Sequence, residues 1–314
     1  MTVMGTVHAL RQADTATIAE AATAFLFTLD HPETQGTRRV YASTLRALRA
    51  EFGDTTDTAE LAPGAVAAWF SAKWGQSAPA TWNRNLDGLR SAQRYWQDQG
   101  WMTVIDLTAA IRRRQRRVDR SCALSRREIE RLLTRDDISI RERTLWRMLY
   151  ESAARSAEVL RLDVEDLDLA NRRAKVTRKG GAVDVIVWQT KTAMLLPRLL
   201  KGRKSGPVFL TDRRSRVELP PGDIDRASGK ARLSYRRAAE IFEEATDGEQ
   251  GGLWTLHQLR HSALTHDAEN GASTPMLMAK SGHTSVASLA RYARPSSEAL
   301  QRWQEQNDPG RRRP

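Results

Sequence analysis

The stretch His257-Gln-Leu-Arg260-His261, followed by Ser281-Gly282-His283 and then Arg291-Tyr292, is the most informative part of this chain. Positions i, i+3 and i+4 lie on one face of a helix, so the two histidines and the arginine of the first motif point the same way. An arginine fork matches two oxygens of a phosphate, and a histidine can donate a hydrogen bond or move a proton near neutral pH. A tyrosine hydroxyl can act as a nucleophile when neighbouring groups activate it. The stretch therefore indicates chemistry at a phosphodiester.

A second arginine, Arg155, stands upstream in Ala153-Ala154-Arg155-Ser156-Ala157-Glu158. Its apolar neighbours make an isolated guanidinium costly unless an anion meets it. One interpretation is a phosphate clamp formed with Arg260. The alternatives are a salt bridge to Glu158, which could itself orient the clamp, and for Arg260 a surface charge on a helix.

These motifs together resemble those of the tyrosine recombinases, the phage-integrase and Xer family of site-specific DNA recombinases. That family carries an arginine in a helix-start turn, a lysine on a β-hairpin, a His-x-x-Arg pair, a Gly-His and a tyrosine shortly after it. The corresponding positions, in chain order, are Arg155, Lys179, His257, Arg260, His283 and Tyr292. The family usually has Leu-Gly-His where this chain has Ser281-Gly282-His283, a change that we expect to affect local packing only.

The resemblance implies a role for each of the six residues. Tyr292 attacks the phosphodiester and forms a 3′-phosphotyrosine, Arg155 and Arg260 bind the non-bridging oxygens, and His283 donates to one of them. His257 assists proton transfer at the phenol, and Lys179, in the turn Arg178-Lys179-Gly180-Gly181, protonates the departing 5′ oxygen. Lys175 and Lys191 are alternatives for this last role. A type IB topoisomerase and a non-catalytic DNA-binding regulator on the same fold are the competing functions.

Composition supports a nucleic-acid partner. The 314 residues carry a formal charge of +12 and a sequence pI near 10.4, which is typical of proteins that meet a polyanion. The single cysteine, Cys122, excludes an internal disulfide and fits a reducing compartment. No His-Glu-x-x-His element, secretion signal or membrane-length apolar run occurs, so we expect no metal, no other cofactor, no membrane contact and a cytoplasmic, nucleoid-associated protein.

The pattern along the chain predicts a mainly α fold with a small three-stranded antiparallel sheet, and the resemblance implies that it is arranged as a two-domain DNA clamp with the parts given next. The expected parts are an N-terminal tail (1–14), a helical core-binding (SAM-like) DNA-binding domain (15–111), a basic linker (112–122), a catalytic tyrosine-recombinase domain (123–306) and a basic disordered tail (307–314). Apolar residues at three- and four-residue steps predict four or five short helices in the first domain.

Arginine is concentrated where the first domain should end. Like charges packed this densely resist core burial, so we expect the linker to lie against phosphates, or part of it to form a solvated helix end. A further DNA contact is expected in Thr81-Trp82-Asn83-Arg84-Asn85-Leu86, the part of this domain most similar to the family. The candidate DNA-binding residues are Arg84, Arg112, Arg113, Arg114, Arg116 and Arg117.

The second domain should begin at a capping box, Ser125-x-x-Glu128. Alternating or β-branched runs at 166–169, 174–178 and 183–188 predict the three strands. Helices are expected at 190–200, 234–245, 256–270, 274–280, 285–292 and 297–306.

The resemblance also predicts the assembly. In the family a terminal helix docks into a neighbouring protomer, and here Ala299, Leu300 and Trp303 form its expected apolar face; packing on its own chain is the alternative. We therefore expect a homo-tetramer on double-stranded DNA with paired inverted-repeat sites, with accessory DNA-bending proteins as further candidates. The target sequence, the order of strand exchange and the choice among integration, excision and resolution are not encoded visibly.

Overall fold

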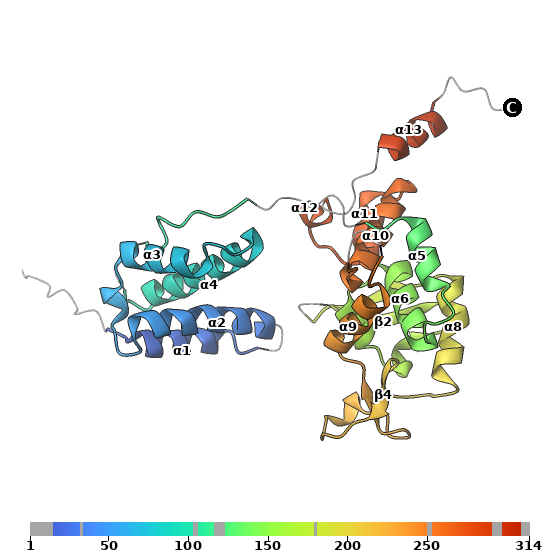
Figure 1. Cartoon of the computed structure of the whole chain (residues 1–314), viewed down its shortest axis with the longest axis horizontal. Coiled ribbons are helices and arrows are strands. Elements are labelled where there is room, and N and C mark those ends of the chain that lie inside the picture. Colours follow the sequence, from blue (N-terminus) through green and yellow to red (C-terminus); the bar gives the residue numbers. More distant parts are fainter. Residues whose placement is uncertain are drawn as a thin grey trace, which may run out of the picture. The chain divides into compact units, whose positions relative to one another are not determined.

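The computed structural model of the chain describes residues 15–31, 34–102, 106–115, 123–178, 181–249, 253–290 and 297–308. It divides into two compact units, Met1–Arg117 and Val118–Pro314. Both are built mainly from helices, and small antiparallel sheets occur only in the second among the described residues (Figure 1). The predicted mainly α fold with a small antiparallel sheet is confirmed.

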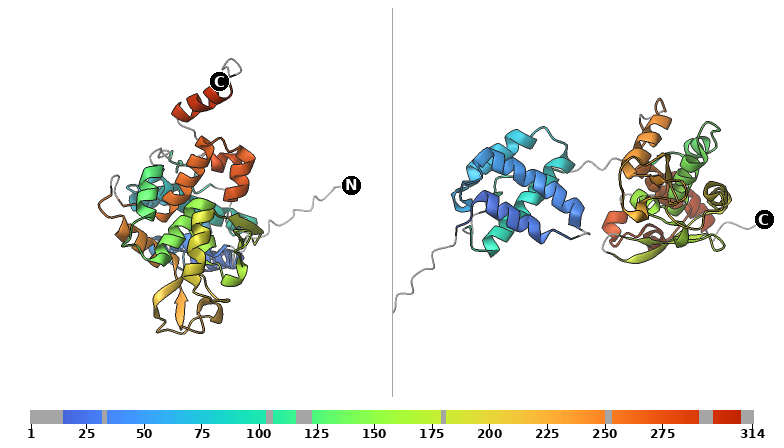
Figure 2. Two further views of the ribbon diagram at one scale, coloured as in Figure 1. Left: turned by 90° about the vertical axis from the view of Figure 1, so that its right-hand side faces the viewer. Right: turned by 90° about the horizontal axis from the view of Figure 1, so that it is seen from below.

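Four α-helices make up most of the described part of the N-terminal unit: α1 (Ile18–Thr28), α2 (Gln35–Phe52), α3 (Pro63–Trp74) and α4 (Pro79–Asp98), with a 3-10 turn at Thr58–Glu60. Helix α4 packs along α2 and α1 (Figure 2). Leu45 and Leu48 of α2 and Leu86 and Leu89 of α4 are almost fully buried in one core. Their three- and four-residue spacing is the helical period that predicts these elements.

The first part of the expected linker is bound to α4. The Asn83 side chain accepts a hydrogen bond from the Arg114 backbone N–H at 2.9 Å and donates to its carbonyl at 2.8 Å. The Trp82 indole donates to the Arg112 carbonyl at 2.9 Å, and the Arg114 guanidinium lies 3.8 Å above the Trp82 ring. Helix α4 therefore fixes the course of the backbone at residues 112–114.

The C-terminal unit is organised around α6 (Ile140–Ser152), which packs against both α8 and α10. Trp146 of α6 is fully buried, and its ring meets that of Phe242 edge-on with centroids 5.0 Å apart. The other helices are α5 (Arg126–Leu133), α7 (Ser156–Leu160), α8 (Thr190–Leu200), α9 (Tyr235–Ala245), α10 (Leu256–Glu269), α11 (Thr274–Ser281), α12 (Val286–Leu289) and α13 (Ser297–Gln306), with 3-10 turns at Val164–Asp166 and Pro221–Asp223. No helix in the described part of the chain is long and apolar enough to cross a membrane.

Two local predictions are confirmed in this unit, the capping box before α5 and the bounds of α8. The capping box at the start of α5 is present, with the Glu128 N–H donating to the Ser125 hydroxyl and the Ser125 N–H donating to the Glu128 carboxylate. Helix α8 covers the predicted residues. Of the helix predicted at 285–292, α12 covers Val286–Leu289, and residues 291 and 292 lie outside the described part.

The predicted sheet is present, with β1 (Leu167–Asp168), β2 (Arg173–Thr177) and β3 (Val183–Val187) in the order β1-β2-β3 and all pairs antiparallel. A second sheet of two strands, β4 (Leu210–Arg214) and β5 (Lys230–Arg232), was not predicted. Strand β4 is partly or fully exposed along its length, so it lacks the alternation of apolar and polar residues that identifies a half-buried strand.

The contact between α4 and residues 112–114 gives a test of local stability. Asn83→Ala removes both hydrogen bonds to Arg114 and leaves two backbone groups without these partners, which costs about 1–3 kcal/mol. We expect faster hydrogen exchange at the Arg114 amide, measured by mass spectrometry or NMR. The control is Arg84→Ala, an exposed position on the same helix. Unchanged exchange in Asn83→Ala would contradict the assignment.

Candidate active site

Two consecutive carbonyl groups at the end of α11 accept hydrogen bonds from three arginines. The Ser281 carbonyl accepts from Arg260 Nη2 at 2.9 Å and from Arg178 Nη1 at 3.0 Å. The Gly282 carbonyl accepts from Arg155 Nη2 at 3.4 Å. Arg260 belongs to α10, Arg178 directly follows β2 and Arg155 directly precedes α7, so this turn joins three parts of the unit. His283 follows directly, and its position depends on these contacts.

Arg155 is held at the N-terminus of α7 by Glu158. The Arg155 backbone N–H donates to Glu158 Oε2 at 3.0 Å, and its Nη1 donates to Oε1 at 2.7 Å. Glu158 is buried, whereas 41% of the Arg155 side chain is exposed. The salt bridge is therefore present, and it orients a guanidinium that still has a face open to an incoming anion. Ala153, which ends α6 in the left-handed region at φ 52°, turns the chain just before Arg155.

Arg260 is buried, so the alternative of a surface charge is wrong. Its Nη1 donates to the Ala153 carbonyl at 2.5 Å, and its Nη2 approaches His283 Nε2 at 3.4 Å. A buried guanidinium is costly unless polar partners meet its N–H groups. The left-handed residue Ala153 supplies one of these partners, so the end of α6 helps to fix Arg260.

Ser281 determines which nitrogen of His283 carries the proton. The fully buried Ser281 hydroxyl donates to the Leu277 carbonyl at 2.6 Å, as expected one turn back along the helix, and lies 2.7 Å from His283 Nδ1. Because the hydroxyl proton is used in this way, the serine oxygen accepts and Nδ1 is the protonated nitrogen. Ser281 is therefore more than a change in local packing.

Both candidate histidines are held in the neutral form. Burial, followed by the charges of Arg260, Arg155 and Arg178 and by His257, lowers the pKa of His283 to about 4. The pKa of His257 is also lowered, first by burial of part of the ring and then by Arg260 and Arg155, although the side chain keeps an exposed face. A neutral imidazole at pH 7 can accept a proton, which suits His257 as a base toward a phenol.

The described residues bring together Arg155, His257, Arg260 and His283. Lys179 and Tyr292 lie outside the described part of the chain, as do Arg116, Arg117 and Cys122. Of the other candidate DNA contacts, Arg84 and Arg112 are exposed. Arg113 pairs with Asp87, and Arg114 donates to the Ser77 carbonyl in addition to stacking on Trp82.

The two alternative lysines differ in their surroundings. Lys191 Nζ lies 2.8 Å from Glu130 Oε2, and Glu130 also pairs with Arg147. Lys175 is on the exposed face of β2. By contrast, Lys179 directly follows Arg178, whose guanidinium lies in the cluster, and this sequence neighbour favours Lys179.

Sequence reasoning missed Arg178 as a member of the cluster. It is buried, and its Nη1 lies 3.3 Å from Glu158 Oε2 while its Nε donates to Asp184 Oδ2 at 2.5 Å. The only local signal was its place beside the glycine turn, which does not predict burial.

His266 has a structural environment. Its ring is buried, and Nδ1 lies 2.8 Å from the Tyr150 hydroxyl. Burial lowers the pKa of His266 and raises the pKa of Tyr150. No group of three or more histidine, cysteine, aspartate or glutamate side chains suited to a metal occurs among the residues that the structure describes.

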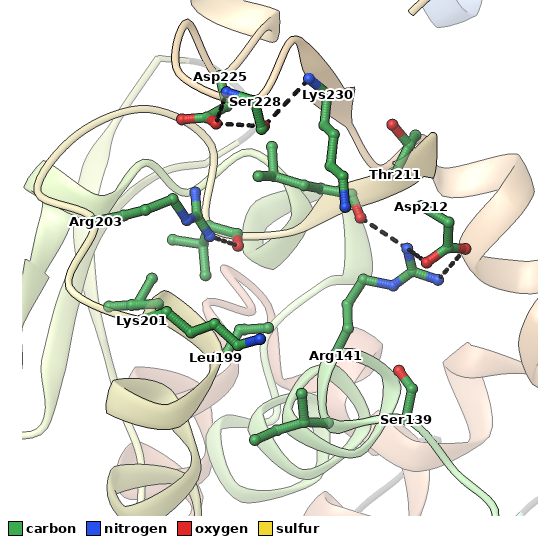
Figure 3. Close-up of a pocket in the computed structure, with 14 residues that line it drawn as sticks. Ser139, Arg141, Leu199, Lys201, Arg203, Thr211, Asp212, Asp225, Ser228 and Lys230 are labelled. Carbon is green, nitrogen blue, oxygen red and sulfur yellow. Dashed lines mark hydrogen bonds and ion pairs between the residues drawn. The ribbon is translucent and has the colours of Figure 1, made fainter. Parts of the chain in front are cut away.

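A cavity of about 440 Å³ lies elsewhere in the C-terminal unit, between the start of α6, the end of α8 and the β4–β5 sheet (Figure 3). Arg141 donates to the Leu210 carbonyl and to Asp212, and Asp225 accepts from Ser228. Two of its charged groups are thus paired with each other, and none of the four described candidate catalytic residues lines it. We therefore place the active site at the arginine cluster.

The geometry defines the class of site. The guanidinium groups are held in place by hydrogen bonds, and that of Arg155 is partly exposed. Such groups are suited to neutralising phosphate oxygens as negative charge develops. Two neutral histidines beside them can exchange protons or donate hydrogen bonds. The fold and the cluster together are those of a phosphoryl-transfer enzyme acting on a polyanion.

Comparison with known proteins identifies the family. The model of the phage integrase family matches residues 123–299, more than half of the chain, and the chain belongs to this family of tyrosine recombinases. Tyrosine recombinase XerC of Mycobacterium sp. (strain KMS) is 26% identical over 287 residues, covering 84% of this chain and 89% of that protein. XerC of Mycobacterium tuberculosis (strain ATCC 25177 / H37Ra) is 25% identical over 273 residues, covering 82% and 87%.

Solved structures share the fold. A lambda integrase tetramer bound to a Holliday junction aligns with a TM-score of 0.69 and 16% identity, covering 90% of this chain and 78% of that one. The XerH site-specific recombinase bound to its difH substrate, in a pre-cleavage complex, aligns with a TM-score of 0.66 and 16% identity, covering 91% and 93%.

The state of His283 can be measured. In the free protein we expect ¹⁵N NMR to show a neutral ring protonated on Nδ1 that titrates near pH 4. The unfolded chain titrates near 6.5, so stability that is fully present above pH 6.5 is lost progressively as the pH falls to about 4. Ser281→Ala should raise the Nε2–H population, whereas the exposed neighbour Thr284→Ala should not. A ring that titrates near 6.5 in the folded protein would contradict this assignment.

Proposed function

We propose that this protein is a site-specific recombinase that cuts and rejoins DNA through a 3′-phosphotyrosine at Tyr292. The observation that carries the proposal is the convergence of Arg155, Arg260 and His283 on the turn that leads toward Tyr292. Membership of the tyrosine recombinase family supports it. The chemistry implies that integration, excision or resolution of DNA elements is the biological outcome.

Each candidate residue has a separate role in the proposed cleavage reaction. Arg155 and Arg260 bind the non-bridging oxygens, and His283 donates to one of them once the incoming phosphate offsets the surrounding arginine charges. The phenol oxygen of Tyr292 bonds to phosphorus while its proton passes to His257. The bond from phosphorus to the 5′ oxygen breaks, and Lys179 supplies the proton that this oxygen needs.

Rejoining is the same reaction in reverse. A 5′ hydroxyl from the same or another strand attacks phosphorus, and the tyrosine leaves as a phenol. The phosphotyrosine ester conserves the free energy of the broken phosphodiester, so no ATP or other cofactor is needed in this scheme.

We assign DNA binding to both parts of the chain. The helical unit is proposed as the core-binding domain (15–111), residues 112–122 as the basic linker, and residues 123–306 as the catalytic domain. Arg84 and Arg112 have exposed side chains that can reach phosphates. Because the reaction takes place on DNA, we place the protein in the cytoplasm in association with the nucleoid.

We further propose that the active form is a tetramer on two inverted-repeat sites, with accessory DNA-bending proteins where the site requires them. Helix α13 leaves 60% of Leu300 and 52% of Trp303 exposed, an apolar surface suited to docking on a second copy. The similar lambda integrase structure is a tetramer on a Holliday junction, which supports this assembly. A topoisomerase acting as a monomer has no need of such a helix.

The nucleophile is tested with a nicked duplex whose sequence is taken from genomic junctions that the protein rejoins. We expect a covalent protein–DNA adduct that is lost in Tyr292→Phe, because the attacking oxygen is removed. Tyr235→Phe is the matched control, since this tyrosine is 53% exposed at the start of α9. Denaturing gel electrophoresis measures the adduct.

Each other outcome identifies an alternative. An adduct that persists in Tyr292→Phe rejects the assignment of the nucleophile. No adduct in the wild-type protein on its own site favours a DNA-binding regulator. Adducts with relaxation of supercoiled DNA but no exchange between two sites favour the topoisomerase.

The electrostatic part of DNA binding is tested by salt. Each phosphate contact that releases a counterion contributes a slope of about 0.9 to the plot of log affinity against log salt. Arg112→Ala should reduce the magnitude of this slope by about one and weaken binding to all sequences alike. The control is Arg236→Ala, an exposed arginine on α9 that pairs with Glu240. An unchanged slope for Arg112→Ala would remove this residue from the interface.

A further inference from the structure

Arg178 is a buried arginine that has no role in the reaction proposed above. It directly follows β2 (Arg173–Thr177), and its side chain is nine-tenths buried. Burying a guanidinium is costly unless good partners replace water. Its Nε donates to Asp184 Oδ2, and its Nη1 lies 3.3 Å from Glu158 Oε2 and 3.0 Å from the Ser281 carbonyl. Its Nη2 is buried without a hydrogen-bond partner among the described residues.

The partners of Arg178 come from three elements that carry different parts of the active site. Asp184 lies on β3, the other strand of the hairpin whose turn holds Lys179. Glu158 lies in α7 and binds Arg155. Ser281 ends α11 and hydrogen-bonds His283. One side chain therefore connects the hairpin to the phosphate clamp and to the histidine turn.

The backbone of Gly282 is shaped around the same side chain. Gly282 has φ +65°, and a Cβ built there would lie 2.2 Å from Cζ of Arg178. A left-handed conformation already favours glycine, and the guanidinium occupies the space that a side chain would need. The arginine is thus packed against the turn as well as hydrogen-bonded to it.

Arg178 does not act on the phosphate itself. Its Nη2 is enclosed, and its other two nitrogens are committed to Asp184, Glu158 and Ser281. A buried N–H without an acceptor lowers stability, so fold stability alone is a poor reason for an arginine at this place.

We propose that Arg178 is a positioning residue that holds the Lys179 hairpin against the phosphate clamp and the His283 turn. The inference rests on the proposed function and adds to it a residue that acts through Lys179. Lys179 is a long, flexible side chain on a glycine turn, so its reach to the departing oxygen depends on where the hairpin is fixed. Without Arg178, β2 and β3 remain paired with each other but lose these links to α7 and α11.

The test is single-turnover cleavage of two nicked duplexes of the same sequence, one with the natural 5′ oxygen at the cleaved phosphate and one with sulfur in its place. A thiol ionises near pH 8.5, far below an alcohol, so a thiolate leaves without a proton donor. A defect in the general acid is therefore rescued by sulfur, whereas a defect in phosphate binding or in folding is not.

We expect Arg178→Met to slow cleavage of the oxygen substrate roughly 10- to 100-fold, as small displacements of catalytic groups do. On the sulfur substrate the defect should shrink to within about threefold of the wild type, as for Lys179→Met, because the proton donor is bypassed. The double variant Arg178→Met/Lys179→Met should be no slower than Lys179→Met alone, because both changes remove one function. DNA affinity should stay within about threefold for Arg178→Met, since no phosphate contact is lost.

Two further variants keep the test decisive. Arg173→Met, on the exposed face of the β2 strand that Arg178 follows, is the matched control and should cleave both substrates at the wild-type rate. If circular dichroism shows that Arg178→Met does not fold, Asp184→Asn is used instead. It removes the charge of the more exposed partner of Arg178 and keeps the buried guanidinium of Arg178 itself. Asp184→Asn should slow cleavage of the oxygen substrate less than Arg178→Met does, and the sulfur substrate should again restore the rate.

The outcomes separate this proposal from the function on which it rests. A defect in Arg178→Met, or in Asp184→Asn, that persists on the sulfur substrate overturns the positioning role, as does a wild-type rate on the oxygen substrate. If the wild-type protein forms no Tyr292-dependent adduct on either substrate, the proposed function fails and this inference fails with it.

Discussion

The candidate active site depends on a single backbone oxygen, the Ser281 carbonyl, which accepts hydrogen bonds from the guanidinium groups of both Arg260 and Arg178. A carbonyl has two lone pairs, so one oxygen can hold two donors from different elements. Through it, helix α10 and the β2–β3 hairpin are fixed relative to the end of α11. The like charges of the two arginines are tolerated because Glu158 and Asp184 lie against Arg178.

The electrostatics follow from this arrangement. Within the described part of the site, Arg155, Arg178 and Arg260 contribute three positive charges and Glu158 and Asp184 two negative ones, while the histidines are neutral at pH 7. The remaining positive charge matches one phosphodiester. Because the donors are already in place, little reorganisation accompanies the build-up of charge in the transition state.

Local signals predicted the elements well. The capping box at Ser125 and the limits of α8 depend on residues that are neighbours in sequence, so pattern alone identified them. Strand β4 is partly or fully exposed and lacks such a pattern, and β5 has only three residues, so neither could be predicted. The candidate residues Arg155, His257, Arg260 and His283 were assigned from the resemblance of their motifs, in order and spacing, to those of the family, and the structure places them together.

The contacts that sequence reasoning could not reach are those between distant segments. Arg178 and Ser281 are 103 positions apart, and no pattern near either residue indicates the other. The hydrogen bond between Ser281 and His283 is local, but it depends on the serine being buried at the end of α11 with its proton directed to Leu277. The sequence showed only that a serine replaces the family's usual leucine.

The packing of Arg178 on Gly282 also constrains how this chain can diverge. While an arginine fills the space over the turn, any side chain at position 282 collides with it. Glycine is therefore required there for two reasons, the left-handed backbone conformation and the contact with Arg178. A small residue at position 178 would open that space and leave only the backbone preference, which asparagine can also satisfy. These two positions should therefore covary among close relatives, and an exchange at one of them should become tolerable only after a change at the other.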